Sequence, residues 1–267
     1  MLIRYNQMPG SRLEPAEKVL KAAIHSWTHP LERKPTCPRA FVTVSRQPGA
    51  GAISFSHRLA QLLNEEGEAD WSAWDRELVE KVSAEHGIAK DLIEMIPNRH
   101  HNWLDELLQG LSASKYPPDV AELRAYKRVI MTIRALATAG HAIIVGLGGT
   151  FVTDRMPGAI HLRLVAPLEH RIKSMAERDS IPLHEAAARV TDIDRSRSDF
   201  YRRYWPSKTI EPQTFTMTLN SAELSVDELV ECVLPVIRSR EGASPGHEKT
   251  TEMTGGAVAL SGAAEQK

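Results

Sequence analysis

The sequence has few of the residues that mark secreted, disulfide-linked or membrane-embedded proteins. Cysteine occurs only at Cys37 and Cys232, without the spacing of a metal site or a redox motif. Such sparse cysteine is typical of a reducing compartment, and we expect a cytoplasmic protein. No run approaches the ~18 apolar residues of a membrane span, and the N-terminal segment lacks the apolar stretch of a signal peptide. The sequence therefore predicts no membrane association.

A surplus of charge of either sign is also missing, since 33 lysines and arginines stand against 34 aspartates and glutamates. No global electric field therefore attracts nucleic acid, and we expect no nucleic-acid partner. Hydrophobic residues make up 42% of the chain, which is ordinary for a soluble globular protein. Local motifs must therefore identify the chemistry.

The motif around which the chain is organised is a glycine-containing turn between a strand and a helix. The apolar, β-branched run 41–44 predicts a buried parallel strand, and the apolar spacing over 54–63 predicts one face of a helix. Between them lie Gly49 and Gly51. Glycines in such a turn let backbone N–H groups surround an anion, and the helix N-terminus adds its dipole. The segment 45–54 is thus a candidate phosphate-binding loop, with a plain tight turn as the alternative.

The loop departs from the pattern GxxxxGK[ST] in an informative way. With Gly51 as the second glycine, Arg46 occupies the first glycine position and Ala52 occupies the lysine position. Ser54 falls one place later than the pattern asks. The match to the pattern is therefore poor, and the rest of the chain has to decide between a phosphate-binding loop and a tight turn.

Strands that alternate with helices predict an α/β fold with a parallel sheet. Further short apolar runs predict strands at 69–74, 142–145, 160–165 and 214–219. Helical periodicity predicts helices at 13–27, 120–139 with Gly140 as the C-cap, 168–204 and 226–237, with several short helices after Trp74 and up to residue 112. Ligands of such folds bind at the carboxyl ends of the strands, where the segments 45–54, 74–77 and 146–149 all lie.

The chain divides into three parts. Residues 1–40 form an N-terminal extension with one amphipathic helix, which needs a partner surface on its own domain or on a second copy of the chain. Residues 41–238 form the α/β domain. Residues 239–267 lack periodicity and are expected to be a disordered tail.

Several segments, taken in order, resemble the cytidylate kinase-like family of P-loop kinases. They are SRQPGAGA (45–52), WDRELVEKV (74–82), IIVGLGGTFV (143–152), the arginine-rich stretch 161–205 and LNSAELSVDELVECV (219–233). The resemblance covers about residues 41–237. It implies a P-loop kinase three-layer sandwich, with a five-stranded parallel sheet, a helical insert on the acceptor side and an arginine-rich lid. It also implies ATP as the phosphoryl donor, Mg²⁺ as the cofactor, and CMP or a related nucleoside monophosphate as the acceptor.

The resemblance assigns candidate residues to each part of the site. The ATP-binding residues are Arg46, Gly49, Ala50, Gly51, Ala52 and Ser54, and the acceptor-binding residues are Asp75, Arg76, Gly146 and Gly148. Ser54 is interpreted as a Mg²⁺ ligand, with capping of the loop helix as the alternative. Asp75 before Arg-Glu-Leu is equally well explained as a helix N-cap.

The stretch 171–203 contains seven arginines that can surround a transferring phosphate. Arg178, Arg195 and Arg197 correspond to the lid arginines of the family and are the candidate catalytic residues. We interpret Arg171, Arg202 and Arg203 as surface or acceptor-side residues. Because acidic residues alternate with all of them, a solvated helix face is the competing explanation.

Two departures from the family leave the function open between classes. Ala52-Ile53 replaces the glycine and cation of the phosphate loop, and Leu147 replaces the arginine of a Gly-Arg-Gly turn after the third strand. Arg46 is a hypothetical substitute for the loop cation. The sequence predicts a nucleoside monophosphate kinase acting on a pyrimidine monophosphate. The alternatives are a degenerate kinase-like protein that binds nucleotide as a regulatory or interaction module, and a P-loop kinase with another acceptor.

Overall fold

The apolar run predicted at 41–44 forms the central strand of the sheet. In the computed structural model, which describes residues 39–66, 70–84 and 118–242, this run is part of β1 (Phe41–Arg46). Val42 and Val44 point into one core and Phe41 into the other, as expected for a strand that is covered on both faces. β1 pairs in parallel with a strand on each side.

The sheet has five parallel strands in the order β2-β3-β1-β4-β5. The other four strands are β2 (Ser72–Trp74), β3 (Ala142–Val145), β4 (Ala159–Val165) and β5 (Met217–Asn220). β2 and β3 therefore lie on one side of β1, and β4 and β5 lie on the other. This arrangement confirms the predicted fold class.

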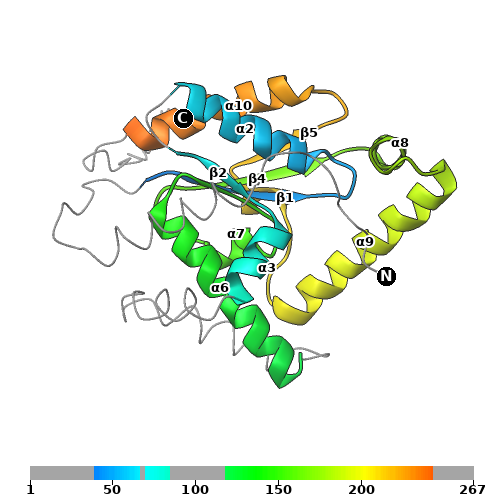
Figure 1. Cartoon of the computed structure of the whole chain (residues 1–267), viewed down its shortest axis with the longest axis horizontal. Coiled ribbons are helices and arrows are strands. Elements are labelled where there is room, and N and C mark those ends of the chain that lie inside the picture. Colours follow the sequence, from blue (N-terminus) through cyan, green and yellow to red (C-terminus); the bar gives the residue numbers. More distant parts are fainter. Residues whose placement is uncertain (1–38, 67–69, 85–117, 243–267) are drawn as a thin grey trace, which may run out of the picture.

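Helices cover both faces of the sheet (Figure 1). α2 (Ala52–Glu66) and α10 (Val226–Gly242) pack together on one face, while α3 (Arg76–Ala84), α6 (Val120–Ala139) and the short α7 (Gly149–Val152) lie on the other. Trp71 belongs to the first core and Trp74 to the second, and both are buried as predicted.

α6 occupies the residues that its periodicity predicted. It begins with a capping box in which Asp119 accepts from the backbone of Glu122 and the Glu122 carboxylate accepts from Asp119 N–H. It ends at Gly140, with φ 77°, whose N–H donates to Leu136 O. Both terminal turns are therefore paired, which fixes the helix beneath the sheet.

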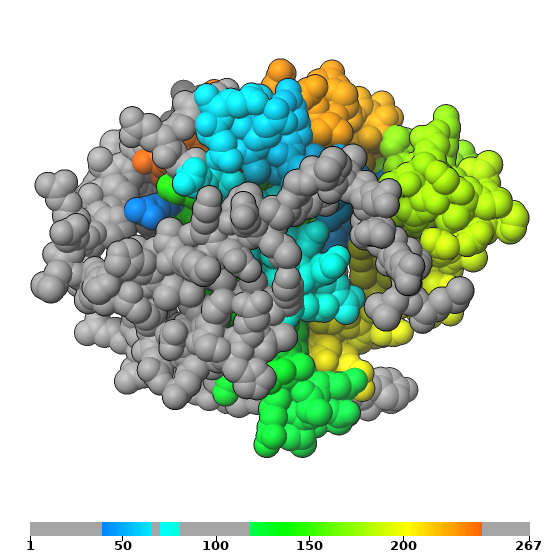
Figure 2. Space-filling model, in the orientation of Figure 1, coloured from blue at the N-terminus to red at the C-terminus, as the bar shows by residue number. Residues whose placement is uncertain are grey.

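The stretch predicted to be helical over 168–204 forms two helices, α8 (Leu168–Asp179) and α9 (Leu183–Tyr204). The chain turns at Ser180, which has φ 53°, and α9 follows Pro182. A small core of its own holds the hairpin together, built from Met175, Ala176, Ala186 and Val190. In the space-filling view the hairpin forms a lobe at one edge of the molecule, and it is the arginine-rich lid expected from the resemblance (Figure 2).

Several predicted boundaries differ from the structure. β5 begins at Met217 and not at residue 214, because Pro212–Thr214 forms a 3₁₀ turn in which Thr214 Oγ1 accepts from Glu211 N–H. α10 continues to Gly242, past the boundary predicted at 238. β2 covers 72–74 of the predicted 69–74.

Other predictions fall outside the described residues. These are the N-terminal helix, with any self-association through it, the part of the acceptor-side insert beyond α3, and the tail after residue 242. Among the described helices, none has the length and hydropathy needed to cross a bilayer.

Candidate functional site

The loop after β1 leaves an open space in front of α2. Gly49 and Gly51 both have left-handed backbone angles, with φ 80° and 70°. At Gly49 a β-carbon would overlap the carbonyl oxygen of Arg171, so this glycine is needed for packing against the lid. At Gly51 the same position has no described atom within 4 Å beyond its chain neighbours. A ligand can therefore approach the backbone at Gly51, next to the first N–H groups of α2.

Ser54 lies in the first turn of α2, with an exposed side chain. The alternative that it caps this helix is wrong, because α2 begins two residues earlier, at Ala52. Its hydroxyl remains available to a ligand bound at the open loop.

The turn after β3 also contains left-handed residues, but the protein's own side chains fill it. Gly146, Leu147 and Gly148 have φ 82°, 54° and 72°. A β-carbon at Gly146 would overlap the guanidinium of Arg46. At Gly148 it would lie 2.9 Å from the Tyr126 hydroxyl and 3.0 Å from Trp205 Nε1. The two predicted acceptor-side glycines therefore make room for side chains of this chain.

Tyr126 holds the turn after β3 in place. Its hydroxyl donates to Leu147 O at 3.1 Å and accepts from Trp205 Nε1 at 2.9 Å. Burial raises the pKa of Tyr126 well above its usual value, so the hydroxyl keeps its proton for this contact. The sequence showed Tyr126 only as one apolar-face position of a helix, and nothing in that pattern indicated the hydrogen bonds.

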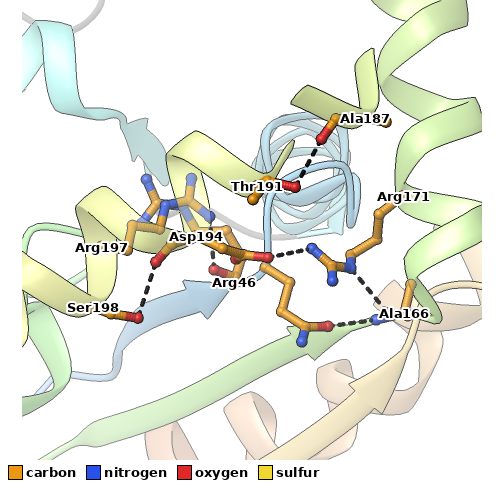
Figure 3. Close-up of polar contacts among 9 residues, drawn as sticks. Arg46, Ala166, Arg171, Ala187, Thr191, Asp194, Arg197 and Ser198 are labelled. Atoms are coloured by element: carbon orange, nitrogen blue, oxygen red, sulfur yellow. Dashed lines mark hydrogen bonds and ion pairs between the residues drawn. The ribbon is translucent and has the colours of Figure 1, made fainter. Parts of the chain in front are cut away.

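Two arginines from distant parts of the chain meet at the end of β1. Arg197 of α9 donates from Nη1 to Arg46 O at 2.9 Å (Figure 3). Burial, and next the charge of Arg46, lower the pKa of Arg197 to about 10. Burial also lowers the pKa of Arg46, where Tyr201 acts in the opposite direction and Arg76 in the same one. Among the described residues, no carboxylate forms an ion pair with Arg46 or Arg197, although the charges of Asp75 and Asp194 oppose the lowering of the two pKa values.

Arg171 is buried and connects α8 with α9, so the prediction that it lies on the surface or at the acceptor is wrong. Its Nη1 pairs with Asp194 Oδ2 at 2.8 Å, and its Nε donates to Ala166 O at 3.1 Å (Figure 3). Ala166 N–H in turn donates to the side-chain oxygen of Gln47 in the glycine loop. These contacts connect α8, α9 and the loop, which holds Arg197 over the end of β1.

The other two candidate catalytic arginines lie apart from this cluster. Arg178 is exposed and makes a two-point contact with Asp179, at 2.8 and 3.1 Å. Arg195 is 70% exposed, with Asp192 at 3.9 Å. Residues two apart on a helix point about 200° apart, so Arg195 faces away when Arg197 faces inward. A catalytic role for Arg178 and Arg195 remains a prediction, and of the three the structure brings only Arg197 to the site.

Asp75 and Arg76 lie at the end of β2, beside the same cluster. Asp75 Oδ1 accepts from Leu78 N–H at 2.9 Å, which confirms the N-cap interpretation. Arg76 pairs with Glu80 at 2.7 Å and remains exposed. The charge of Asp75 raises the pKa of Arg46 and the charge of Arg76 lowers it. Their role in binding an acceptor stays a prediction.

The aromatic residues at the end of the lid are packing groups, as expected. Tyr201 contacts Phe151 edge-on with ring centroids 5.6 Å apart, and Tyr204 lies 4.3 Å from Tyr126. Trp205 ends α9 and packs 5.7 Å from Phe151. The end of α9 is thereby fixed to α6 and α7.

The sheet order, the open glycine loop before α2 and the arginine-rich hairpin define an α/β protein of the P-loop kinase fold class. A solved structure with a similar fold is that of an uncharacterized protein from Eubacterium ventriosum, with a TM-score of 0.57 and 17% identity. The similarity covers 75% of this chain and 99% of that one. At this identity it shows the fold alone.

The sequence profile of the cytidylate kinase-like family matches residues 41–223, well over half of the chain. The chain therefore belongs to the cytidylate kinase-like family. A cytidylate kinase from Sulfolobus acidocaldarius is 29% identical over 91 residues, which is 34% of this chain. That match spans 49% of the relative, about half of its length.

Proposed function

We propose that the protein is an ATP-dependent nucleoside monophosphate kinase that phosphorylates CMP or a related pyrimidine monophosphate. The observation that supports this most directly is the meeting of Arg46 and Arg197, without a described counter-ion, beside the open loop at Gly51. Two nearby cations at the end of a strand repel each other, and an anion between them removes that repulsion. Membership of the cytidylate kinase-like family makes a nucleotide phosphate the natural anion.

In this proposal the loop and the lid position the phosphates. Backbone N–H groups near Gly51 and the N-terminus of α2 hold the ATP phosphates. The acceptor's phosphate oxygen forms a bond to the γ-phosphorus while the bond to the β-phosphate oxygen breaks, giving ADP and a nucleoside diphosphate with no net proton change. Arg197 stabilises the charge on the transferring group, because its planar fork remains charged and can bind two oxygens.

Mg²⁺ suits this site if most of its ligands come from phosphates and water. Ser54 offers one exposed hydroxyl oxygen beside the open loop, and no cluster of acidic, histidine or cysteine ligands exists in the described part of the chain. Mg²⁺ commonly binds with few protein ligands plus substrate phosphates, so Ser54 would hold it. When bound, the ion would neutralise charge on the donor phosphates.

A second candidate is a nucleotide-binding module without kinase activity. The observation that favours it is Ala52 at the lysine position of the loop, together with Leu147 in the turn after β3. Each single electrostatic contact is worth ~10²–10³ in rate, so two missing cations would reduce turnover strongly unless other groups replace them.

The decisive experiment is ATP consumption by the purified full-length chain with Mg²⁺ and a panel of nucleoside monophosphates. We expect turnover with CMP or another pyrimidine monophosphate. Arg197→Ala should lower kcat more than it raises KM, by roughly 10²-fold, as for a contact made mainly in the transition state. Arg189→Ala is the matched control, because Arg189 also lies on α9 but is paired with Glu185 at 2.7 Å.

A second variant separates binding from chemistry. Gly51→Val would fill the open space and should abolish the thermal stabilisation that ATP gives, since a ligand stabilises only through its affinity for the folded state. Failure of the wild-type protein to turn over any monophosphate, with ATP stabilisation retained, would establish the binding module instead.

A further inference from the structure

The positive charge missing from the turn after β3 is present in space, although it comes from another strand. The resemblance places an arginine at position 147, where this chain has leucine. Arg46, the last residue of β1, directs its guanidinium toward that turn and lies directly against Gly146. Gly146 pairs with β1 through its N–H, which donates to Val44 O at 3.0 Å. Only a residue without a β-carbon leaves space for the guanidinium here.

The surroundings of Arg46 indicate that it serves an anion and not a partner within the described chain. Arg46 is partly buried, which lowers the pKa of its guanidinium, and no described carboxylate forms an ion pair with it. Arg197 adds a second cation without a described ion pair at the same edge. Arg76 is exposed and paired with Glu80, and the charge of Asp75 acts on Arg46 in the opposite direction. Burying a charge without a partner is costly, so such a cluster is stable only when an anion completes it or when water reaches it. A phosphate dianion matches both the charge and the fork geometry of arginine.

The direction of the side chain distinguishes the two phosphates of the proposed reaction. The donor loop continues from β1 toward α2, and Gly51 is open on that side. Arg46 instead extends toward β3, and the residues whose charges affect it are Asp75 and Arg76 at the end of β2, together with Tyr201. β2 and β3 lie on the same side of β1. Arg46 therefore belongs to the half of the site opposite the donor loop.

We propose that Arg46 binds the phosphate of the acceptor nucleoside monophosphate and supplies the positive charge that the turn after β3 does not provide. This inference rests on the proposed kinase function for the identity of the ligand. It assigns Arg46 to the acceptor, in place of the donor contact expected from its position in the loop sequence. The donor phosphates are then held by backbone N–H groups and Ser54 without help from Arg46.

The test compares Arg46→Met with the wild-type full-length chain. Binding of CMP, of cytidine and of a non-hydrolysable ATP analogue is measured by calorimetry, and KM is measured separately for ATP and for the acceptor. Arg46→Met should weaken CMP binding at least tenfold, leave cytidine binding unchanged, and change the affinity for the ATP analogue by less than about twofold. Arg46→Lys should recover part of the CMP affinity, because it keeps the charge but loses the fork.

Arg134→Met is the matched control for the loss of a buried arginine. Arg134 of α6 is also buried, but it donates to Val152 O at 2.7 Å, away from the cluster. Its substitution should lower the melting temperature without changing the CMP affinity of the folded protein. If Arg46→Met fails to fold, Arg46→Lys and Gly146→Ala, which displaces the guanidinium, give the same comparison.

The outcomes separate this inference from the kinase proposal. Loss of ATP-analogue binding with CMP binding retained would assign Arg46 to the donor and overturn the inference, while kinase activity could still be present. Arg46-dependent CMP binding without turnover would support the inference and refute the kinase. Equal weakening of CMP and cytidine would show that Arg46 does not act on phosphate, and absence of binding of CMP and inorganic phosphate to the wild type would overturn both.

Discussion

Two turns of this molecule contain glycines with left-handed backbone angles, but one turn is open and the other is filled by side chains. After β1, Gly51 has a left-handed backbone and faces open space. After β3, Gly146 and Gly148 have the same kind of backbone and face Arg46, Tyr126 and Trp205. Both turns end strands at the carboxyl edge of the sheet, where α/β folds bind ligands.

The difference shows that a glycine motif by itself does not define a ligand site. A left-handed glycine removes a β-carbon, and what then occupies the space depends on the neighbouring strands. At Gly51 the space stays open among the described residues. At Gly146 it receives a guanidinium, and the ligand is expected one step further out, on the arginine itself.

The largest effect should come from comparing alanine at the two glycines of the first turn. Gly49→Ala combines left-handed strain with overlap of the Arg171 backbone and should lower the free energy of unfolding by roughly 2–5 kcal/mol. Gly51→Ala meets no neighbouring atom and should lose only about 1–2 kcal/mol. Denaturant unfolding measures both, and equal losses would contradict the distinction between a packed and an open glycine.

The support beneath the second turn should respond to pH. His161 lies in β4, and its Nδ1 hydrogen-bonds Thr43 Oγ1, which contacts Thr150 of α7. Burial lowers the pKa of His161 to about 4. The unfolded chain therefore binds a proton between about pH 6.5 and 4 while the folded chain does not, and stability falls as the pH falls through this range. The loss amounts to about 3 kcal/mol at most.

Unfolding of His161→Gln across the same range checks this prediction. The variant should have a shallower dependence on pH between 6.5 and 4 than the wild-type protein. An unchanged slope would mean that other groups dominate the acid response.

Removing the hydroxyl that holds the second turn should have an intermediate effect. Tyr126→Phe leaves Leu147 O and Trp205 Nε1 without their partner, and unpaired buried groups cost about 1–3 kcal/mol. The change in unfolding free energy measures it. Phe200→Leu is a useful comparison, because it alters the packing on Tyr126 without removing a hydrogen bond.

Displacing Arg46 through the glycine beneath it should affect the acceptor more than the fold. A β-carbon in Gly146→Ala would push the far end of a flexible side chain, so little stability is lost beyond the left-handed strain. The KM for the acceptor should rise about tenfold, as expected for one charge-assisted contact. An unchanged acceptor KM would indicate that the guanidinium is not positioned for the phosphate.

The smallest effect is expected from restoring the arginine that the resemblance places at position 147. Leu147 has φ 54° and packs against the core that contains Tyr126, while the guanidinium of Arg46 already occupies this turn. Leu147→Arg should therefore leave turnover unchanged or lower it. A tenfold or larger gain would show that the turn lacks a cation it needs.

Helices and strands could be predicted from the sequence where the apolar periodicity extended over many residues and capping residues marked the ends. The limits of α6 follow from its apolar spacing, from Asp119 and from Gly140. The start of β5 could not be predicted in this way. Thr214 continues the alternating pattern of the strand, but its hydroxyl accepts a hydrogen bond from Glu211 N–H in a 3₁₀ turn. Local polar contacts of this kind compete with a strand and leave no trace in the hydrophobic pattern.

The site was predictable only in outline. The sequence indicates which arginines belong to the lid, but helical geometry then separates Arg195 from Arg197, and the choice depends on which face meets β1. The position of Arg46 depends on β3 being the neighbour of β1, which is a property of the strand order. No spacing within one segment contains that information.

The hydrogen bond of Trp205 gives the molecule an internal optical probe. Trp205 directly follows α9, and its indole N–H donates to the Tyr126 hydroxyl, which in turn donates to Leu147 O in the turn after β3. Indole emission shifts with the polarity and hydrogen bonding of its surroundings. Trp71 is buried in the core on the opposite face of the sheet, and Trp74 is buried in the same core as Trp205, within β2. Movement of the lid relative to the turn should therefore change the emission of Trp205, and the Trp205→Phe variant, which lacks this emission, is the control. Ligand binding can then be followed in real time without an added label.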